Sequence, residues 1–410
     1  MDLNILERLK LPSEGIRVAD RRLLQGNESI CEGAIAAGVR FYAGYPITPC
    51  TEIAEQMSIR QAAVGGVYLQ MEDEVGSIHA VMGASLTGTK SMTATAGPGI
   101  SLMQDGIGWA QTDEIPALIV NVQRAGPGLG NATRSGQMDI MQARWGPNGD
   151  REAIVLSPST VEESFWLTLK AVNLSERFQT GVITVPEGLV GLMREVVDIP
   201  DYDTVPIETR LMPDDEGAAD PSRIYDGTMT EIRPFAAVGT EHRSINGNWM
   251  RPETDATHGV RMPLTGLSAQ DYNIRRLHHK ITKRRDEVTF VEEVYTDDAE
   301  VLLIAFGTQA RTARFAVDQL REKGVKAGLL RLITLFPFPE EIVQRAAANA
   351  NLVIVPEMNM GQIRGEVTRV LRQHPAEIVG VNHVDSTYIE PDEIMELVPV
   401  AARHLEGAAV

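Results

Sequence analysis

Cysteine is scarce in this sequence. Only Cys31 and Cys50 occur among 410 residues, and no CxxC pair is present. Iron–sulfur clusters and structural zinc sites need sets of Cys or His ligands, so we expect this chain alone to hold neither, and no other metal. Unpaired cysteines suit a reducing compartment. The sequence also lacks any run of about 18 apolar residues and any apolar core of a signal peptide near its N-terminus. These absences predict a cytoplasmic protein without a membrane segment.

Positive charge is also in short supply. The 38 Lys and Arg residues are outnumbered by 56 Asp and Glu residues, which gives a net charge of -18. This balance argues against nucleic acid or an anionic membrane as a partner. A phosphate-bearing cofactor stays possible, because helix N-termini bind anions without a net positive charge.

The order of apolar and helical segments predicts an α/β fold. Up to residue 198, short apolar runs alternate with helical patterns, which is typical of a doubly wound domain with about six parallel strands. Residues 299–410 repeat this alternation and predict a second α/β domain. Between them, residues 199–298 are rich in Asp, Pro and Gly and end in a basic stretch. We interpret this region as a connecting arm, with the basic stretch 275–285 on a solvated helix face.

The run GYPITPCTEIAEQM places Thr48 between Pro46 and Pro49. Each proline fixes its own φ and disfavours helix at the residue before it, so we expect Thr48 in a stiff extended loop. The loop follows a predicted strand, and ligands bind at the carboxyl ends of strands in open α/β sheets. A turn without a ligand explains the same spacing.

A second run, MEDEVGSIHAVMGAS, places Glu74 at the start of a predicted helix. Acids in a first helical turn suit the helix dipole, and this simple explanation stays open. If Glu74 instead points inward, burial would raise the pKa of its carboxyl and let it exchange a proton with a buried heterocycle.

Two further strand ends carry candidate residues. Gly97, Pro98 and Gly99 link a strand to a helix in TATAGPGISLM, where backbone N–H groups could receive an anion or where the glycines could serve tight packing. Arg124 ends an apolar strand in NVQRAGPGLGN. A buried guanidinium needs an anionic partner, which could be a ligand carboxylate or an acidic residue of the protein.

Six segments in the same order resemble the alpha-type subunit of the thiamine diphosphate-dependent 2-oxoacid:ferredoxin oxidoreductases. The resemblance covers most of the chain. The segments are GNESICEGAIAAGVRFYAGYPITPCTEIAEQM, EDEVGSIHAVMGAS, TATAGPGISLMQDGIG, EIPALIVNVQRAGPGLGN, LFPFP and PEMNMGQ.

This resemblance implies a pyrimidine-binding domain in residues 1–198 and a transketolase C-terminal-like domain in residues 299–410. It implies that Glu74 contacts the aminopyrimidine ring of thiamine diphosphate and promotes formation of the reactive carbon nucleophile. Gly97 and Pro98 are expected in the same cofactor site. Thr48 and Arg124 match the residues that bind the substrate carboxylate.

The resemblance also implies partner chains. The sequence lacks the GDG and downstream Asn that hold the magnesium and diphosphate end of the cofactor. The family places these, with [4Fe-4S] clusters, on a beta subunit, and adds gamma and ferredoxin-like subunits. The implied reaction, active only in the complex, is oxidative decarboxylation of a 2-oxoacid with coenzyme A, with electrons passed to ferredoxin or another acceptor such as NAD. A non-oxidative thiamine diphosphate-dependent decarboxylase or transferase, and a non-catalytic scaffold, are the alternatives.

Two departures leave the substrate open. Cys50 replaces the usual Ser, as an apolar filler or as a change at the pocket edge. GPGLGN resembles the branched-chain type more than the GPSTGxPT of the 2-oxoglutarate type. Arg134 could still pair with a distal carboxylate, whereas Trp109 and Trp145 would suit an apolar or aryl side chain. Branched-chain, aryl and 2-oxoglutarate-like substrates are therefore all compatible with the sequence.

Overall fold

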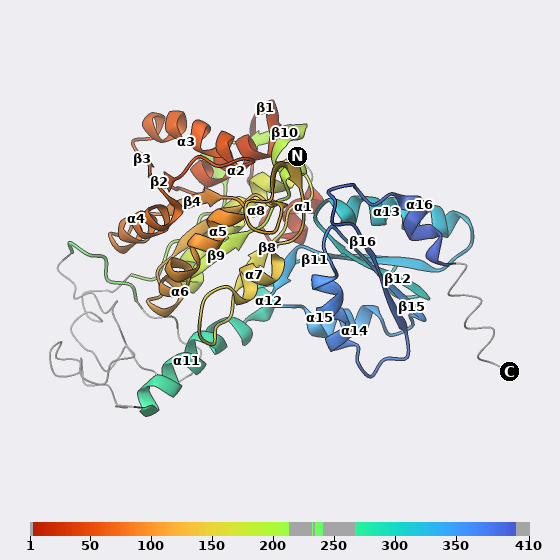
Figure 1. Cartoon of the computed structure of the whole chain (residues 1–410). Helices are drawn as coiled ribbons and strands as arrows, with labels where there is room; N and C mark the ends of the chain where they lie inside the picture. The colour runs from red at the N-terminus through yellow and green to blue at the C-terminus, as the bar shows by residue number, and fades with distance from the viewer. Residues whose placement is uncertain (1–2, 213–231, 233, 241–266, 399–410) are drawn as a thin grey trace.

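The computed structural model describes residues 3–212, 232, 234–240 and 267–398. These residues form two α/β units that lie side by side, with the second unit in blue (Figure 1). Within these ranges, no helix combines the length and the apolar composition that crossing a membrane requires.

The first unit contains a seven-stranded sheet. Its edge strand β14 is antiparallel to its neighbour, and the other strands run parallel. Across the sheet the strands are β14 (Thr334–Phe336), β8 (Ile154–Leu156), β9 (Gly181–Thr184), β5 (Ala117–Asn121), β4 (Ser91–Thr95), β2 (Phe41–Gly44) and β3 (Val67–Gln70). Parallel strands joined by helices in this order form a doubly wound fold, which confirms the predicted fold class.

Helices cover both faces of this sheet. Its central strands are buried on both sides and need apolar cover on each. One face packs on α2 (Gly26–Ala36), α3 (Thr51–Ala63) and α8 (Val161–Phe178). The other face packs on α4 (Glu74–Leu86), α6 (Gln104–Thr112) and α7 (Ile140–Trp145).

The second unit contains a five-stranded sheet, in which only β11 is antiparallel. Its strands, in spatial order, are β11 (Val291–Val294), β13 (Ala327–Leu332), β12 (Val301–Phe306), β15 (Leu352–Glu357) and β16 (Glu377–Asn382). Its helices are α13 (Gly307–Glu322), α14 (Glu340–Ala346), α15 (Gln362–Val370) and α16 (Pro391–Met395). The fold of this unit also agrees with the predicted second α/β segment.

The two units are joined by shared apolar packing and by a shared strand. One buried apolar cluster runs from Ile119 and Ile183 in the first sheet to Phe306 and Leu330 in the second. Strand β14 belongs by sequence to the second unit but pairs with β8 of the first. The domain boundaries at residues 198 and 298 therefore stay a prediction from the sequence. In the structure, the segments on either side of them pack against each other.

Shorter elements frame the first unit. The helix α1 (Leu3–Arg8) packs beneath α8, and an antiparallel ribbon joins β1 (Val18–Gln25) to β10 (Arg194–Pro200). The helix α9 (Gly188–Leu192) follows β9.

Most of the described part of the connecting region packs on the first unit. It contains the 3-10 turn Tyr202–Thr204, α11 (Leu267–Thr282) and α12 (Arg285–Val288), whereas β11, also within residues 199–298, belongs to the second sheet. Residues 213–231, 233 and 241–266 lie outside the described ranges. The solvated face predicted for the basic stretch is wrong at two positions. Arg276 and Lys280 are each 1% exposed, and both form ion pairs with the buried Glu114. The carboxylate of Glu114, distant in sequence, compensates the cost of burying these cations.

The cap of α8 offers a stability test. The Oγ1 atom of Thr160 accepts a hydrogen bond from the main-chain N–H of Glu163 at 3.0 Å. We expect Thr160→Ala to lower the free energy of unfolding by about 1 kcal/mol because this N–H loses its partner. Urea unfolding of the full chain measures the loss. Thr160→Ser keeps the hydroxyl and serves as the control; equal losses in both variants would mean that the cap is not the cause.

Candidate active site

The loop after β2 carries Thr48. The main-chain N–H of Cys50 donates to the carbonyl of Ile47 at 3.0 Å, and the Thr48–Pro49 bond is cis. The loop is thus a turn rather than the extended segment that the prolines predicted, and a cis-proline fits the third position of such a turn. Thr48 is exposed, whereas Cys50 is buried and fills the space below the turn. Burial raises the pKa of the Cys50 thiol to about 12, which keeps it protonated near neutral pH.

Glu74 begins α4, directly behind the cap residue Asp73. Its side chain is buried at 5% exposure, as predicted for an inward-pointing carboxyl. Burial raises the pKa of this carboxyl, and the positive charge of Arg124 opposes the rise in part. A Cβ atom built at Gly99 would lie 2.6 Å from Oε1 of Glu74, so only glycine lets the next strand–helix turn approach this carboxyl.

Arg124 lies in β6 (Arg124–Ala125), which pairs with β7 (Asn131–Ser135). Its Nη1 donates to the carbonyl of Thr48 at 2.9 Å and its Nη2 donates to the carbonyl of Leu129 at 2.6 Å. The Nε atom is buried and has no hydrogen-bond partner among the described residues. The guanidinium is therefore held by main-chain carbonyls rather than by the internal salt bridge that the sequence left open, and it retains an unused donor.

Arg124 contacts the carbonyl of Thr48 and lies close enough to Glu74 for its charge to lower the pKa of that carboxyl, but the structure places Arg134 elsewhere. Arg134 is exposed on β7, next to Ser135, the residue that pairs with Arg124. Successive side chains of a strand point to opposite faces, so Arg134 and Ser135 face opposite ways. The charge of Arg134 acts on Tyr388 of the second unit, where it lowers the pKa of the phenol against the larger effect of burial.

A cavity of about 660 Å³ opens between the two units beside these residues. Gly97 and Pro98 line it, at the start of the short helix α5 (Pro98–Leu102). A Cβ atom at Gly97 would lie 3.0 Å from Nε of Arg124. Because glycine has no side chain, only its backbone lies between the cavity and the guanidinium. The other lining residues are Ser101, Gly126, Pro127, Gly128, Met138, Asp139, Gln142, Asn359, Met360, Gln362 and Val384.

Asp139 is the functional candidate that the sequence reasoning missed. It lines the cavity, and one of its carboxylate oxygens accepts a hydrogen bond from Nδ2 of Asn121 at 3.0 Å. Burial raises the pKa of this carboxyl, while the hydrogen bond and the charge of Arg124 lower it. The polar Asn121 and Gln123 in an apolar strand end were the available signal, because fully buried amides need partners.

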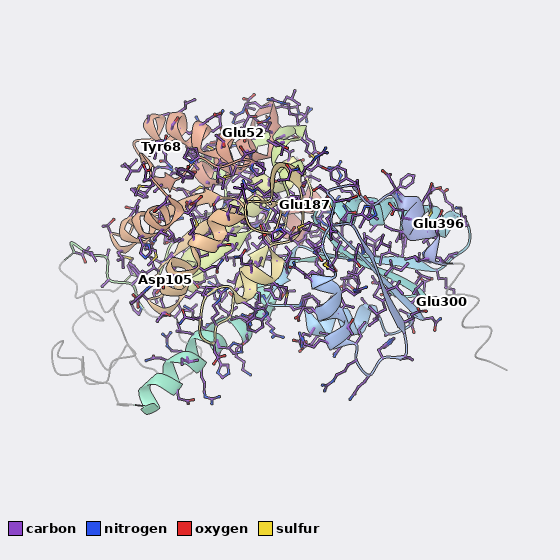
Figure 2. The ribbon with its side chains drawn as sticks, viewed as in Figure 1. Glu52, Tyr68, Asp105, Glu187, Glu300 and Glu396 are labelled. Atoms are coloured by element: carbon purple, nitrogen blue, oxygen red, sulfur yellow. The ribbon has the colours of Figure 1, made fainter. Side chains whose placement is uncertain are left out.

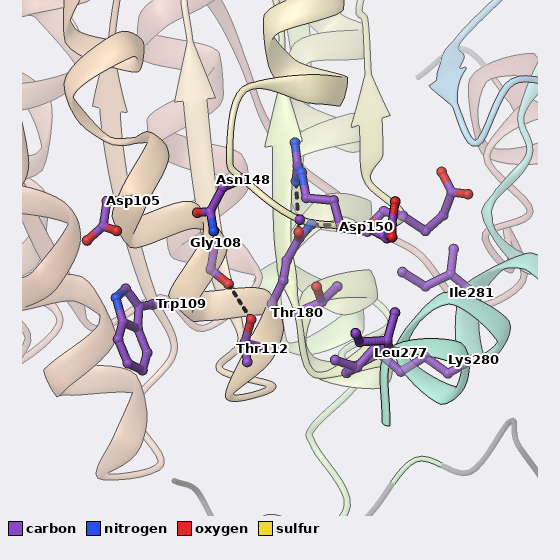
Figure 3. A pocket seen from close by; sticks show the side chains of 15 residues that line it. Asp105, Gly108, Trp109, Thr112, Asn148, Asp150, Thr180, Leu277, Lys280 and Ile281 are labelled. Carbon is purple, nitrogen blue, oxygen red and sulfur yellow. Dashed lines mark hydrogen bonds between the residues drawn. The ribbon is translucent and has the colours of Figure 1, made fainter. Parts of the chain in front are cut away.

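A second cavity, of about 470 Å³, lies between α6 and α11. Figure 3 shows Trp109 and Thr112 of α6 on one side and Leu277, Lys280 and Ile281 of α11 on the other. Its lining includes Thr180, just before β9, so it lies at the amino ends of the strands, opposite the candidate site. Trp109 therefore does not line the first cavity. Neither does Trp145, whose ring stacks on Arg144.

The residues fit one end of thiamine diphosphate. Glu74 supplies a buried carboxyl with a raised pKa, which suits a ring nitrogen. Gly99 lets the neighbouring strand–helix turn pack directly against this carboxyl. Among the described residues that line the 660 Å³ cavity, none is a Lys or Arg that could hold a diphosphate. In the part of the chain that the structure describes, no group of three or more His, Cys, Asp or Glu could hold a metal ion.

This fold and site define a subunit of a thiamine diphosphate-binding oxidoreductase. Residues 32–258 match the family described as "Pyruvate flavodoxin/ferredoxin oxidoreductase, thiamine diP-bdg", and residues 299–394 match "Pyruvate:ferredoxin oxidoreductase core domain II". The chain belongs to this family, as an alpha-type subunit, which confirms the resemblance found in the sequence.

Individual relatives support the same placement. The chain is 41% identical over 372 residues to "2-oxoglutarate synthase subunit KorA" of Methanocaldococcus jannaschii, covering 90% of this chain and 97% of that one. It is 32% identical over 376 residues to "Ketoisovalerate oxidoreductase subunit VorB" of Methanothermobacter thermautotrophicus, covering 92% and 96%.

Solved structures agree with the fold. A 2-oxoglutarate:ferredoxin oxidoreductase from Magnetococcus marinus, solved with 2-oxoglutarate, coenzyme A and succinyl-CoA bound, matches with a TM-score of 0.84 and 29% identity. The match covers 93% of this chain and 65% of that one. A split-gene transketolase matches with a TM-score of 0.51 and 12% identity, and this likeness concerns the fold alone.

Proposed function

We propose that this chain is the alpha subunit of a complex that decarboxylates a 2-oxoacid oxidatively with coenzyme A and passes electrons to ferredoxin or a similar acceptor. The observation that carries the proposal is the junction of Thr48, Glu74 and Arg124 at the carboxyl edge of the first sheet, where Nη1 of Arg124 reaches the carbonyl of Thr48 at 2.9 Å. Family membership supports the reaction class.

Glu74 has the role of a proton carrier in this proposal. Thiamine diphosphate, when bound, supplies the nucleophilic carbon that attacks the 2-oxo group. Burial raises the pKa of the Glu74 carboxyl, which favours its protonated form and so suits it to hold a proton on an Oε atom and pass it to a ring nitrogen. Gly97 and Pro98 would bound the same cofactor site from the cavity side.

Arg124 and Thr48 would hold the substrate carboxylate. The Nε atom of Arg124 is the unused donor, and the Thr48 hydroxyl lies on the turn that Nη1 of Arg124 fixes. Holding the carboxylate orients the neighbouring carbonyl for attack and avoids the entropic cost of a free encounter. Arg134 would reach only a more distant group, such as a second carboxylate.

Partner subunits would complete the site. We propose that a beta subunit supplies the magnesium and diphosphate site and the [4Fe-4S] cluster, and that gamma and ferredoxin-like subunits complete the complex. The described lining of the cavity, which includes neither Lys nor Arg, supports this division, because diphosphate needs cationic partners.

Among substrates we propose 2-oxoglutarate first. The identity to the 2-oxoglutarate synthase subunit, 41%, exceeds the 32% to the ketoisovalerate subunit. The latter keeps a branched-chain 2-oxoacid as the second candidate.

The test is purification of the assembled complex and assay of viologen dye reduction with coenzyme A and a panel of branched-chain, aryl and dicarboxylic 2-oxoacids. We expect dye reduction with at least one of them, fastest with 2-oxoglutarate. A complex loaded with thiamine diphosphate that reduces the dye with none would rule out the proposed reaction.

A further inference from the structure

Glu187 is a fully buried carboxyl to which the proposed chemistry gives no role. It follows β9 at the carboxyl edge of the first sheet, and Figure 2 shows it where the two units meet. Its Oε1 accepts hydrogen bonds from the main-chain N–H of Thr308 and from Nε2 of Gln137, both at 2.7 Å, and its Oε2 accepts one from the Thr308 hydroxyl. Thr308 belongs to the second unit, so one side chain joins both units.

Glu187 caps α13 from outside that helix. The residue at the cap position, Phe306, supplies no side-chain hydrogen bond, and Gly307 has a φ of +56°. A Cβ atom at Gly307 would lie 1.9 Å from Oε1 of Glu187, so only glycine admits the carboxylate. A negative charge at the first turn of a helix interacts favourably with the helix dipole.

Gln137 connects Glu187 to the residues that line the cavity. Besides Glu187, its Nε2 donates to the carbonyl of Phe306 at 3.2 Å, and its Oε1 accepts from the N–H of Met358 at 2.9 Å. Its main-chain N–H donates to the carbonyl of Met358 at 3.2 Å, and its main-chain carbonyl accepts from Nδ2 of Asn359 at 2.7 Å. Both the side chain and the backbone of Gln137 are thus fixed, mostly by the second unit.

The next residues form one wall of the 660 Å³ cavity. Met138 and Asp139 line it directly, and the second unit supplies the facing wall with Asn359 and Gln362. The amide of Gln362 spans the two walls, because Nε2 donates to the carbonyl of Met138 at 2.6 Å and Oε1 accepts from the N–H of Met141 at 2.9 Å.

We propose that Glu187 is a positioning residue: through Gln137 it holds the wall formed by Met138 and Asp139 against the second unit, and so sets the width and polarity of the cavity. This role rests on the proposed function only insofar as the cavity takes part in the reaction.

Titration of Glu187 gives this junction a pH dependence. Its partners Thr308 and Gln137 are neutral, and Tyr388 is a titratable group on which its charge acts. Burial raises the pKa of Glu187 from 4.5 to about 7, and the three hydrogen bonds oppose this rise. Because the folded pKa exceeds the ordinary value, this group's contribution to stability is greatest below pH 4.5 and falls as the pH rises to about 7.

Hydrogen exchange of the full-length chain tests the positioning role without any substrate. Glu187→Ala should speed exchange about tenfold or more in peptides covering residues 138–142 and 308–311, because capping and the Gln137 anchor are lost. Glu187→Gln should restore slow exchange, since its amide can accept from Gln137 and donate to the Thr308 hydroxyl.

A matched control is Glu163→Ala. Glu163 is another buried carboxyl that joins the units, through an ion pair with Arg331, but the hydrogen bonds recorded for its carboxylate go to Ser159 and Arg331 rather than to Gln137. It should lower stability without selective exchange in residues 138–142. Faster exchange there in both alanine variants, or in neither, would overturn the proposal.

Thermal unfolding and kinetics supply independent readouts. The Tm of Glu187→Gln relative to the original protein should rise between about pH 5 and pH 8, because the original protein has one more proton, that of Glu187, to give up on unfolding in this range. In the assembled complex, Glu187→Ala should raise KM several-fold more than it lowers kcat, and Glu187→Gln should rescue KM. A pH-independent Tm difference or an unchanged KM would contradict the positioning role, whereas failure of the proposed function would abolish turnover and leave the exchange result standing.

Discussion

Glu74→Gln in the assembled complex is expected to lower 2-oxoacid-dependent dye reduction about a hundredfold or more, the usual size of a lost proton-transfer group. Glutamine has nearly the same shape, so the packing against Gly99 should persist. What disappears is the carboxyl itself, the proton-exchanging group whose pKa burial raises. Stopped-flow measurement of dye reduction at saturating substrate gives the effect on kcat.

The neighbouring Glu72 provides the matched control, because it is exposed and two residues from Glu74. Glu72→Gln removes the same charge and should leave turnover unchanged. Both variants should assemble and bind thiamine diphosphate, which calorimetric titration measures. Turnover of Glu74→Gln within a factor of about two of the original would remove Glu74 from the proton-carrying role.

Arg124→Ala should lower kcat/KM for every 2-oxoacid by about a hundredfold, since a charge-assisted contact to the substrate carboxylate is lost. Arg124→Lys should recover only part of this loss. The planar guanidinium can bind the carbonyls of Thr48 and Leu129 and a ligand at the same time, whereas the compact ammonium of lysine cannot. The assay is the same substrate panel in the assembled complex, with urea unfolding to confirm that each variant is folded.

A variant of the exposed Arg134 tests which residue binds which end of the substrate. Arg134→Ala should weaken the binding of dicarboxylic 2-oxoacids and leave that of monocarboxylic ones unchanged. The side chain of Arg134 points away from Arg124, so it could contact only a second carboxylate of the substrate. If Arg124→Ala instead affected dicarboxylic substrates alone, Arg124 would bind the distal carboxylate and the proposed arrangement would be reversed.

Local patterns predicted much of the fold. The alternation of apolar runs with helical segments identified the doubly wound sheet, because parallel strands that are buried on both faces consist of nearly continuous apolar residues. The inward direction of Glu74 was also predicted as one of two possibilities. The prolines around Thr48 suggested an extended loop, yet a hydrogen bond from Cys50 to Ile47 closes a turn there. Proline restricts φ but does not choose the hydrogen bond.

Long-range pairing was out of reach of the sequence. The charge pattern of the basic stretch predicted a solvated face, but Glu114, more than 160 residues away, pairs with Arg276 and Lys280. Gln137 showed no local signal for its role, because its partners come from Glu187 and from the second unit. Such contacts depend on topology rather than on spacing along the chain.

Strand β14 has a consequence for how the chain unfolds. It covers the edge of β8, and the apolar cluster from Ile183 to Leu330 continues across the same boundary. Separating the units would expose an open strand edge, which invites aggregation, together with apolar surface from both sheets. Their melting is therefore coupled. Calorimetry should record one cooperative transition for the whole chain rather than two, and a protease should cut the junction only after global unfolding.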